Sequence, residues 1–151
     1  MKIGDKMPEF QIMDQDGNLV ESSALLNKGK SIVLYTYPKD NTSGCTAEAC
    51  SFRDAYAELQ EAGYTVIGVS KDSVKSHAGF RAKHSLPFTL LADTEISLLQ
   101  QLGAWGEKKL YGKTYMGALR KTYIFTPDGT LARIIEKVDT KRAAQQILDE
   151  K

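Results

Sequence analysis

The sequence is poor in cysteine: it has only two, Cys45 and Cys50, among 151 residues. A chain of this length can bury a sufficient hydrophobic core without disulfides, so a stabilising disulfide is a weak explanation for the two cysteines. The chain also lacks an excess of charge of either sign, because it has 20 Lys and Arg and 19 Asp and Glu, and it has no run of basic residues. We therefore expect no nucleic acid and no anionic membrane surface as partner, which leaves small molecules and proteins.

Long hydrophobic runs are absent as well. The first residues, MKIGDKMPEF, lack the apolar segment of a signal peptide, and no run approaches the roughly 18 apolar residues of a membrane span. These features predict a cytoplasmic protein, in a compartment where thiols are kept reduced. Two cysteines there indicate catalysis, redox sensing or metal binding rather than a structural disulfide.

The hydrophobic pattern predicts a single α/β domain spanning residues 1–151. Three segments resemble strands buried in a sheet, and segments typical of helices alternate with them. This order favours right-handed βαβ units and a mostly parallel sheet, with hairpins at Asp16-Gly17 and at Pro127-Asp128-Gly129. The expected strands are SIVLYTY (31–37), YTVIGVS (64–70) and FTLLAD (88–93); the expected helices are 23–29, 46–62, 72–83, 95–102 and an amphipathic helix, 140–151, that buries Ala143, Ala144, Ile147 and Leu148.

Both cysteines follow the first of these strands, in and just after the loop YPKDNTSGC. If a helix begins near Thr46, its free backbone N–H groups and the positive end of its dipole face the Cys45 sulfur and favour the thiolate. A free cysteine is already ~3% thiolate at pH 7, so full ionisation multiplies the reactive fraction by only roughly 30, and fixed donors must supply the rest. Thr42 offers a hydroxyl, Pro38 fixes the backbone and Gly44 allows close approach of a ligand.

The spacing of Cys45 and Cys50 argues against a permanent disulfide. In an intact helix, residues i and i+5 have Cα atoms ~8.6 Å apart, whereas a disulfide tolerates at most ~6.8 Å. Oxidation must therefore unwind the first turns of the helix. Such a bond is strained and readily reduced, which suits a pair that cycles between two redox states.

The segment YPKDNTSGCTAEACSFRD resembles the peroxiredoxins, specifically the peroxiredoxin Q or bacterioferritin comigratory protein branch, with Pro-x-x-x-Thr-x-x-Cys and a second cysteine five residues later. The resemblance continues through GDKMPEFQIMDQDG, KDS, LLAD and GALRKTYIFTPDG. It implies a thioredoxin-like fold, a central mixed sheet flanked by helices with an N-terminal β-hairpin. It also implies a monomeric thiol peroxidase for hydrogen peroxide and organic hydroperoxides, recycled by a thioredoxin-type dithiol, with no metal, haem or flavin.

The same resemblance implies roles for the two cysteines. Cys45 would be the peroxidatic nucleophile that becomes a sulfenic acid, and Cys50 the resolving thiol that condenses with it to an intramolecular disulfide. The chain departs from the branch at Ser43, because members commonly have Pro-Gly before the peroxidatic cysteine. Serine leaves φ free and adds a backbone N–H, so we expect a looser loop.

Further roles follow from the resemblance for residues around Cys45. Thr42 would hydrogen-bond the sulfur and the peroxide, and Pro38 would shield the sulfenic acid from water and over-oxidation. Arg120, in ALRKTYIF, would stabilise the thiolate and polarise the peroxide. Gly44 would belong to the substrate-binding loop, and Glu48 would orient an arginine.

Other interpretations remain open. The two cysteines could be ordinary half-buried thiols or the switch of a redox sensor that changes a protein partner; a general dithiol-disulfide oxidoreductase would use Cys-x-x-Cys instead. Structural zinc needs four ligands, and the only histidines, His77 and His84, are expected to face solvent on a polar helix. Thr42 could be a helix N-cap and Arg120 part of a surface ion pair.

Several large side chains are assigned to packing rather than to chemistry. The aromatic residues of the segment 105–115 could line a substrate mouth, but we expect them to pack onto the core from a loop. Methionine fills irregular gaps in cores, and the same role is expected for Met7, Met13 and Met116.

Overall fold

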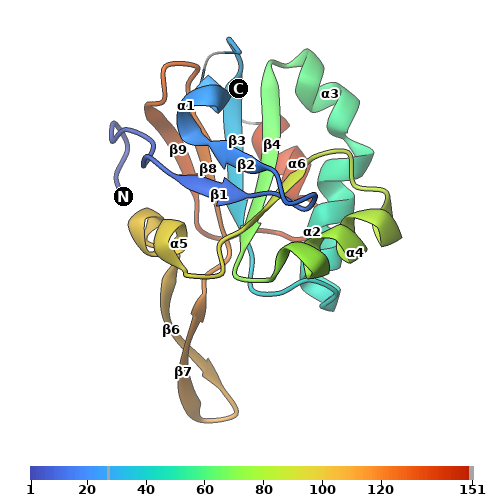
Figure 1. The fold of residues 1–151 in the computed structure, drawn as a ribbon, viewed down its shortest axis with the longest axis vertical. Helices are drawn as coiled ribbons and strands as arrows, with labels where there is room; N and C mark the ends of the chain where they lie inside the picture. Colours follow the sequence, from blue (N-terminus) through green and yellow to red (C-terminus); the bar gives the residue numbers. More distant parts are fainter. Residues whose placement is uncertain (27, 150–151) are drawn as a thin grey trace.

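A five-stranded mixed β-sheet forms the centre of the computed structural model, which describes residues 1–26 and 28–149 (Figure 1). The strand order is β5-β4-β3-β8-β9. β4 and β5 run parallel to the central β3. On the other side of β3, β8 pairs with it antiparallel, and β9 pairs antiparallel with β8. The strands are β3 (Ser31–Thr36), β4 (Tyr64–Ser70), β5 (Thr89–Ala92), β8 (Lys121–Phe125) and β9 (Leu131–Ile135).

Both faces of the sheet are covered, because alternate residues of the buried strands point to opposite sides. Val33 and Tyr35 of β3 belong to a core under four helices, whereas Ile32 and Leu34 belong to a second core under two helices and the N-terminal hairpin. The helices of the first core are α2 (Ser43–Asp54), α3 (Tyr56–Glu61), α4 (Val74–His84) and α6 (Ala143–Leu148). The second core lies under α1 (Ser22–Leu26), α5 (Ser97–Leu102), β1 (Gln11–Met13) and β2 (Leu19–Glu21).

This architecture confirms the expected thioredoxin-like fold with its mixed sheet and N-terminal hairpin. The boundaries differ in detail. The helix expected over 46–62 begins at Ser43 and is divided at Ala55 into α2 and α3. Parts of two other expected helices, at residues 27 and 150–151, lie outside the described residues. No helix in the described part of the chain is long and apolar enough to cross a membrane.

One hairpin was not predicted from the sequence. β6 (Trp105–Leu110) and β7 (Lys113–Ala118) form an isolated antiparallel pair that projects from the body of the molecule (Figure 1). Trp105 packs partly against the core as expected. The expectation is wrong for Tyr111 and Tyr115, which are exposed near the tip of the hairpin.

The packing role expected for the methionines is correct only for Met7, which is buried. Met13 and Met116 lie on the two hairpins, and each exposes about half of its surface, at 48% and 53%. A hairpin packed on one face leaves the other face open, so strand residues of either polarity reach solvent there.

The close packing of the central strands generates a test at Gly68. A Cβ added there would lie 2.8 Å from Leu90 Cδ2 and 2.9 Å from the Tyr35 hydroxyl, so we expect Gly68→Ala to lower the free energy of unfolding by about 1–3 kcal/mol. Gly79→Ala, in α4 with nothing within 4 Å, should instead raise it by about 0.5–1 kcal/mol. Urea unfolding of both variants measures the difference, and equal effects would contradict this packing.

Candidate active site

The loop of residues 37–42 leaves β3 at the carboxyl end of the strand and leads into α2. Open α/β sheets place their binding sites at this end of the strands. Thr42 stands at the N-cap position with extended backbone angles, φ −83° and ψ 156°, and its carbonyl accepts the first helical hydrogen bond, from the Thr46 N–H. Because α2 begins at Ser43, Cys45 lies in its first turn, where the free N–H groups and the helix dipole favour negative charge.

Arg120 connects the Cys45 sulfur to a buried carboxylate. Its Nη2 donates to Cys45 Sγ over 3.2 Å, and its Nη1 donates to Glu48 Oε1 over 2.6 Å. The sheet creates this contact, since Thr36 at the end of β3 pairs with Lys121, which places Arg120 beside the start of the loop. Glu48 follows Cys45 by three residues and therefore shares its face of α2. Cys45 and Glu48 are both buried, at 1% and 0% exposure.

Gly44 is the reason that the guanidinium can come so close. A Cβ added at this position would lie 3.3 Å from Arg120 Nη2, tighter than an ordinary contact. The sequence suggested that Gly44 admits a ligand to the backbone. In the structure, the group that approaches it is the side chain of Arg120.

Burial controls the charges of this cluster. The pKa of Glu48 is raised from 4.5 to about 7, because burial disfavours the carboxylate and the nearby Arg120 only partly offsets that effect. Burial alone would lower the pKa of Arg120, but the charges of Glu48 and Cys45 outweigh it and the pKa lies above its ordinary value. The guanidinium therefore holds a permanent positive charge against the sulfur. Glu48 Oε2 has no hydrogen-bond partner among the described residues.

A second cation near the sulfur escaped the sequence reasoning. Lys108 of β6 is half-buried and donates from Nζ to the Ala118 carbonyl over 3.0 Å. Burial and the charge of Arg120 lower its pKa, and the charge of Cys45 opposes them. Only the unpredicted hairpin brings this lysine to the site, so no local pattern in the sequence could have identified it.

Cys50 lies on α2, half-buried, and both thiols are free. The helix is continuous from Ser43 to Asp54 and therefore passes through both cysteines. This is the conformation in which the two thiols are too far apart to bond. The structure thus corresponds to a reduced protein with an intact helix.

Thr42 and Pro38 are close to Cys45 along the chain, but neither forms a hydrogen bond to the sulfur in the described part of the structure. Pro38 is half-buried at the start of the loop. The Thr42 hydroxyl is exposed and donates to the Lys39 carbonyl over 2.9 Å, and the side chain forms no N-cap hydrogen bond. Since that bond uses the only hydroxyl proton, the oxygen has lone pairs left to accept a hydrogen bond from a ligand.

The prediction that the histidines face solvent is wrong for His77. This residue is fully buried in α4, where its ring lies between Asp40 of the loop and the Leu91 carbonyl of β5. His84 is half-buried against Phe80. A polar residue on a polar helix gives no local sign of burial, and the partner that makes burial of His77 favourable is 37 residues away.

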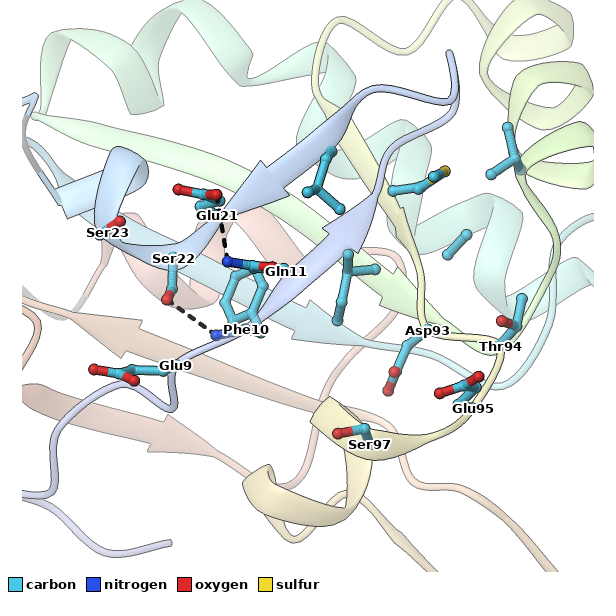
Figure 2. A pocket seen from close by; sticks show the side chains of 15 residues that line it. Glu9, Phe10, Gln11, Glu21, Ser22, Ser23, Asp93, Thr94, Glu95 and Ser97 are labelled. Atoms are coloured by element: carbon cyan, nitrogen blue, oxygen red, sulfur yellow. Dashed lines mark hydrogen bonds between the residues drawn. The ribbon is translucent and has the colours of Figure 1, made fainter.

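A groove of about 900 Å³ lies away from the cysteines, between the β1–β2 hairpin and the segment 92–97 (Figure 2). The residues that line this groove do not include the two cysteines, Thr42 or Arg120. Four carboxylates line it together with exposed apolar side chains of the hairpin, and Asp93 is engaged in a hydrogen bond from the Leu99 N–H that caps α5. Cavity size therefore does not locate the thiol chemistry in this molecule.

Comparison with known proteins gives a consistent result along the whole chain. Residues 3–134 match the family model described as the AhpC/TSA family. The chain is 42% identical to a putative peroxiredoxin bcp of Coxiella burnetii over 91% of this chain and 90% of that protein. It is 44% identical to peroxiredoxin Bcp of Bacillus subtilis, over 93% and 88% of the respective chains.

Solved structures of related proteins share the fold at somewhat lower sequence identity. A PrxQ structure from Xylella fastidiosa superimposes with a TM-score of 0.91 at 30% identity, covering 99% of this chain and 94% of that one. The bacterioferritin comigratory protein of Xanthomonas campestris, described in connection with alkyl peroxide reduction, gives a TM-score of 0.85 at 34% identity over 93% and 88% of the chains.

The buried Glu48 generates a pH-dependent test. Since its pKa is raised from 4.5 in the unfolded chain to about 7, the folded protein binds the extra proton between these values and loses stability as the pH rises. From pH 4.5 to pH 8, we expect the unfolding free energy of the wild type to fall by up to about 3 kcal/mol relative to that of Glu48→Gln. Urea unfolding across this range checks it, and parallel profiles would refute the shift.

Proposed function

The chain belongs to the AhpC/TSA family of peroxiredoxins and is a thiol peroxidase, and from this premise we propose that Cys45 is the residue that reduces the peroxide. The observation that supports this most directly is the bond from Arg120 Nη2 to Cys45 Sγ in the first turn of α2. The substrates that we propose are hydrogen peroxide and organic hydroperoxides. Cys50, by contrast, contacts neither Arg120 nor Glu48 among the hydrogen bonds of the described residues, which fits a resolving thiol.

In the first step, the Cys45 thiolate attacks the nearer peroxide oxygen. The S–O bond forms as the O–O bond breaks, the electron pair leaves on the distal oxygen, and the peroxide proton completes water or an alcohol. The product on the protein is a sulfenate, which takes up a proton from solvent to become the sulfenic acid. Arg120 is already charged and oriented by Glu48, so it can stabilise the developing negative charge without reorganisation. Thr42, with its proton donated to Lys39, accepts the peroxide O–H, and Pro38 limits access of water.

In the second step, Cys50 resolves the sulfenic acid. The first turns of α2 unwind, the Cys50 sulfur attacks the Cys45 sulfur, and the hydroxyl of the sulfenic acid leaves as water. The intramolecular disulfide that results cannot exist in the intact helix, so refolding of α2 favours its reduction. We propose that a thioredoxin-type dithiol is the reductant. It supplies the two electrons that reduce the Cys45–Cys50 disulfide.

The cycle needs one chain, because both thiols lie on the same helix. We therefore propose a monomer whose single domain spans residues 1–151 and which works in the cytoplasm, where dithiol reductants are available.

Replacing each cysteine in turn tests the two proposed roles. Cys45→Ser should abolish peroxide consumption, because the nucleophile is lost. With one equivalent of hydrogen peroxide, the wild type should lose two thiols rapidly, whereas Cys50→Ser should retain a Cys45 sulfenic acid. Thiol counting by mass spectrometry over a quenched time course distinguishes these products. Oxidation of the wild type no faster than that of a free cysteine would refute the peroxidase and favour a redox sensor.

Position 43 tests the unwinding step. Proline is favoured at the first helical position, and the extended backbone of Thr42 is already compatible with a following proline. Ser43→Pro should therefore stabilise the reduced protein by about 0.4–1 kcal/mol and slow disulfide formation roughly 2- to 5-fold. Oxidation of Cys45 should keep its rate. A disulfide step faster than in the wild type would contradict the unwinding mechanism.

A further inference from the structure

The loop of residues 37–42 contains a buried carboxylate that the peroxidase mechanism does not use. Asp40 is 4% exposed, and its Oδ1 accepts a hydrogen bond from the Tyr37 hydroxyl over 2.6 Å. Its Oδ2 accepts from Ser76 Oγ over 2.8 Å and lies 2.8 Å from His77 Nδ1, both on α4. The backbone N–H of Asp40 donates to Asp72 Oδ2 over 2.9 Å. One loop residue is therefore held through its side chain and its main chain.

The hydrogen-bond pattern determines the charges of this cluster. Burial by itself raises the pKa of Asp40, but the hydrogen bonds from His77 and Tyr37 outweigh it, and the pKa lies below its ordinary value. The carboxylate can then only accept. His77 Nε2 lies 3.0 Å from the Leu91 carbonyl, which also can only accept, so both ring nitrogens face acceptors. Asp40 and His77 form a fully buried hydrogen-bonded pair.

The same atoms could suggest a metal site, because Asp40, Asp72 and His77 place ligand atoms within 4.8 Å of one another. Hydrogen bonds already account for these atoms. Both nitrogens of His77 are directed at acceptors, and Asp72 Oδ2 accepts from Ser70 Oγ as well as from the Asp40 N–H. The arrangement is that of a hydrogen-bonded anchor for the loop.

This anchor bears directly on the peroxide site. The loop has irregular backbone, with Asn41 in the left-handed region at φ 65°, and Thr42 is bonded back to Lys39, the neighbour of Asp40. Resting on the proposed function, we propose that His77 is a positioning residue: through Asp40 it fixes the loop that presents Pro38 and Thr42 to the peroxide bound at Cys45. Among the described residues, His77 forms no hydrogen bond to the Cys45 sulfur, so it acts through Asp40.

Two substitutions at His77 separate the contact with the loop from the contact with the sheet. An asparagine places its amide nitrogen near the position of Nδ1, so His77→Asn keeps a donor to Asp40 and loses the bond to Leu91. A glutamine reaches the position of Nε2, so His77→Gln keeps the bond to Leu91 and loses the donor to Asp40. We expect His77→Gln to slow single-turnover oxidation of Cys45 by hydrogen peroxide roughly 10- to 100-fold. His77→Asn should recover most of that loss.

A second electrophile distinguishes positioning from general destabilisation. Iodoacetamide reacts with the Cys45 thiolate without needing an oriented peroxide, so its rate should change far less than the peroxide rate in His77→Gln. A fall of both rates by the same factor would overturn the proposal, as would equal peroxide rates for the two His77 variants. His84→Gln, on the same helix but without contact to the loop, is the matched control and should keep the wild-type rates.

Two further cases need a test of their own: His77 variants that do not fold, and a wild type that does not react with peroxide. If neither His77 variant folds, Ser76→Ala removes a single bond from α4 to Asp40, and we expect a few-fold slower peroxide reaction; an unchanged rate would overturn the proposal. A wild type that fails to react with peroxide would refute the proposed function and this role with it. A reactive wild type whose variants all match it would refute the role of His77 alone.

Discussion

The contact between Arg120 and Cys45 is the interaction on which the site depends. It joins two segments 75 residues apart, and three features of the fold must coincide for it to form. Pairing of β8 with β3 brings Arg120 to the end of the central strand, Gly44 leaves room for the guanidinium, and Glu48 holds its second nitrogen. Burial raises the pKa of Glu48 to about 7, and the nearby Arg120 opposes that rise and favours the ionised carboxylate.

The catalytic cycle makes opposite demands on the two sides of Cys45. The sulfur needs an intact first turn of α2 to lie against Arg120, yet the disulfide to Cys50 needs that turn to open. The structure separates these demands along the chain. Ala49 and Phe52 anchor the later turns of α2 in the core, whereas residues 42 and 43 at its start are exposed and the Thr42 side chain does not cap it. Unwinding can therefore begin at exposed residues, and it must then release the buried Cys45 from Arg120.

The sequence predicted the elements whose signals are local. Apolar strands ending at Pro38 or in polar turns predicted the strands of the central sheet, and the motif around Cys45 predicted where the site lies. The β6–β7 hairpin was missed because WGEKKLYGKTYMGA is rich in lysine and glycine, and its strands are stabilised mainly by each other. The sequence did not reveal three features of the site: the burial of His77, the direction of the Thr42 hydroxyl and the approach of Lys108. Each depends on a partner far along the chain or on a rotamer, and residue type encodes neither.

These failures have a common physical origin, which also explains how the site works. Hydrophobic periodicity records which face of an element is buried, but it says nothing of polar groups that are buried because another segment satisfies them. Glu48, Asp40 and His77 are of this kind: each is buried with a hydrogen-bonding partner from a distant element. Since removing one member leaves a buried polar group without its partner, such pairs fix relative positions more strictly than apolar contacts do. A loop held by them on one side can remain in place while the helix on its other side unwinds.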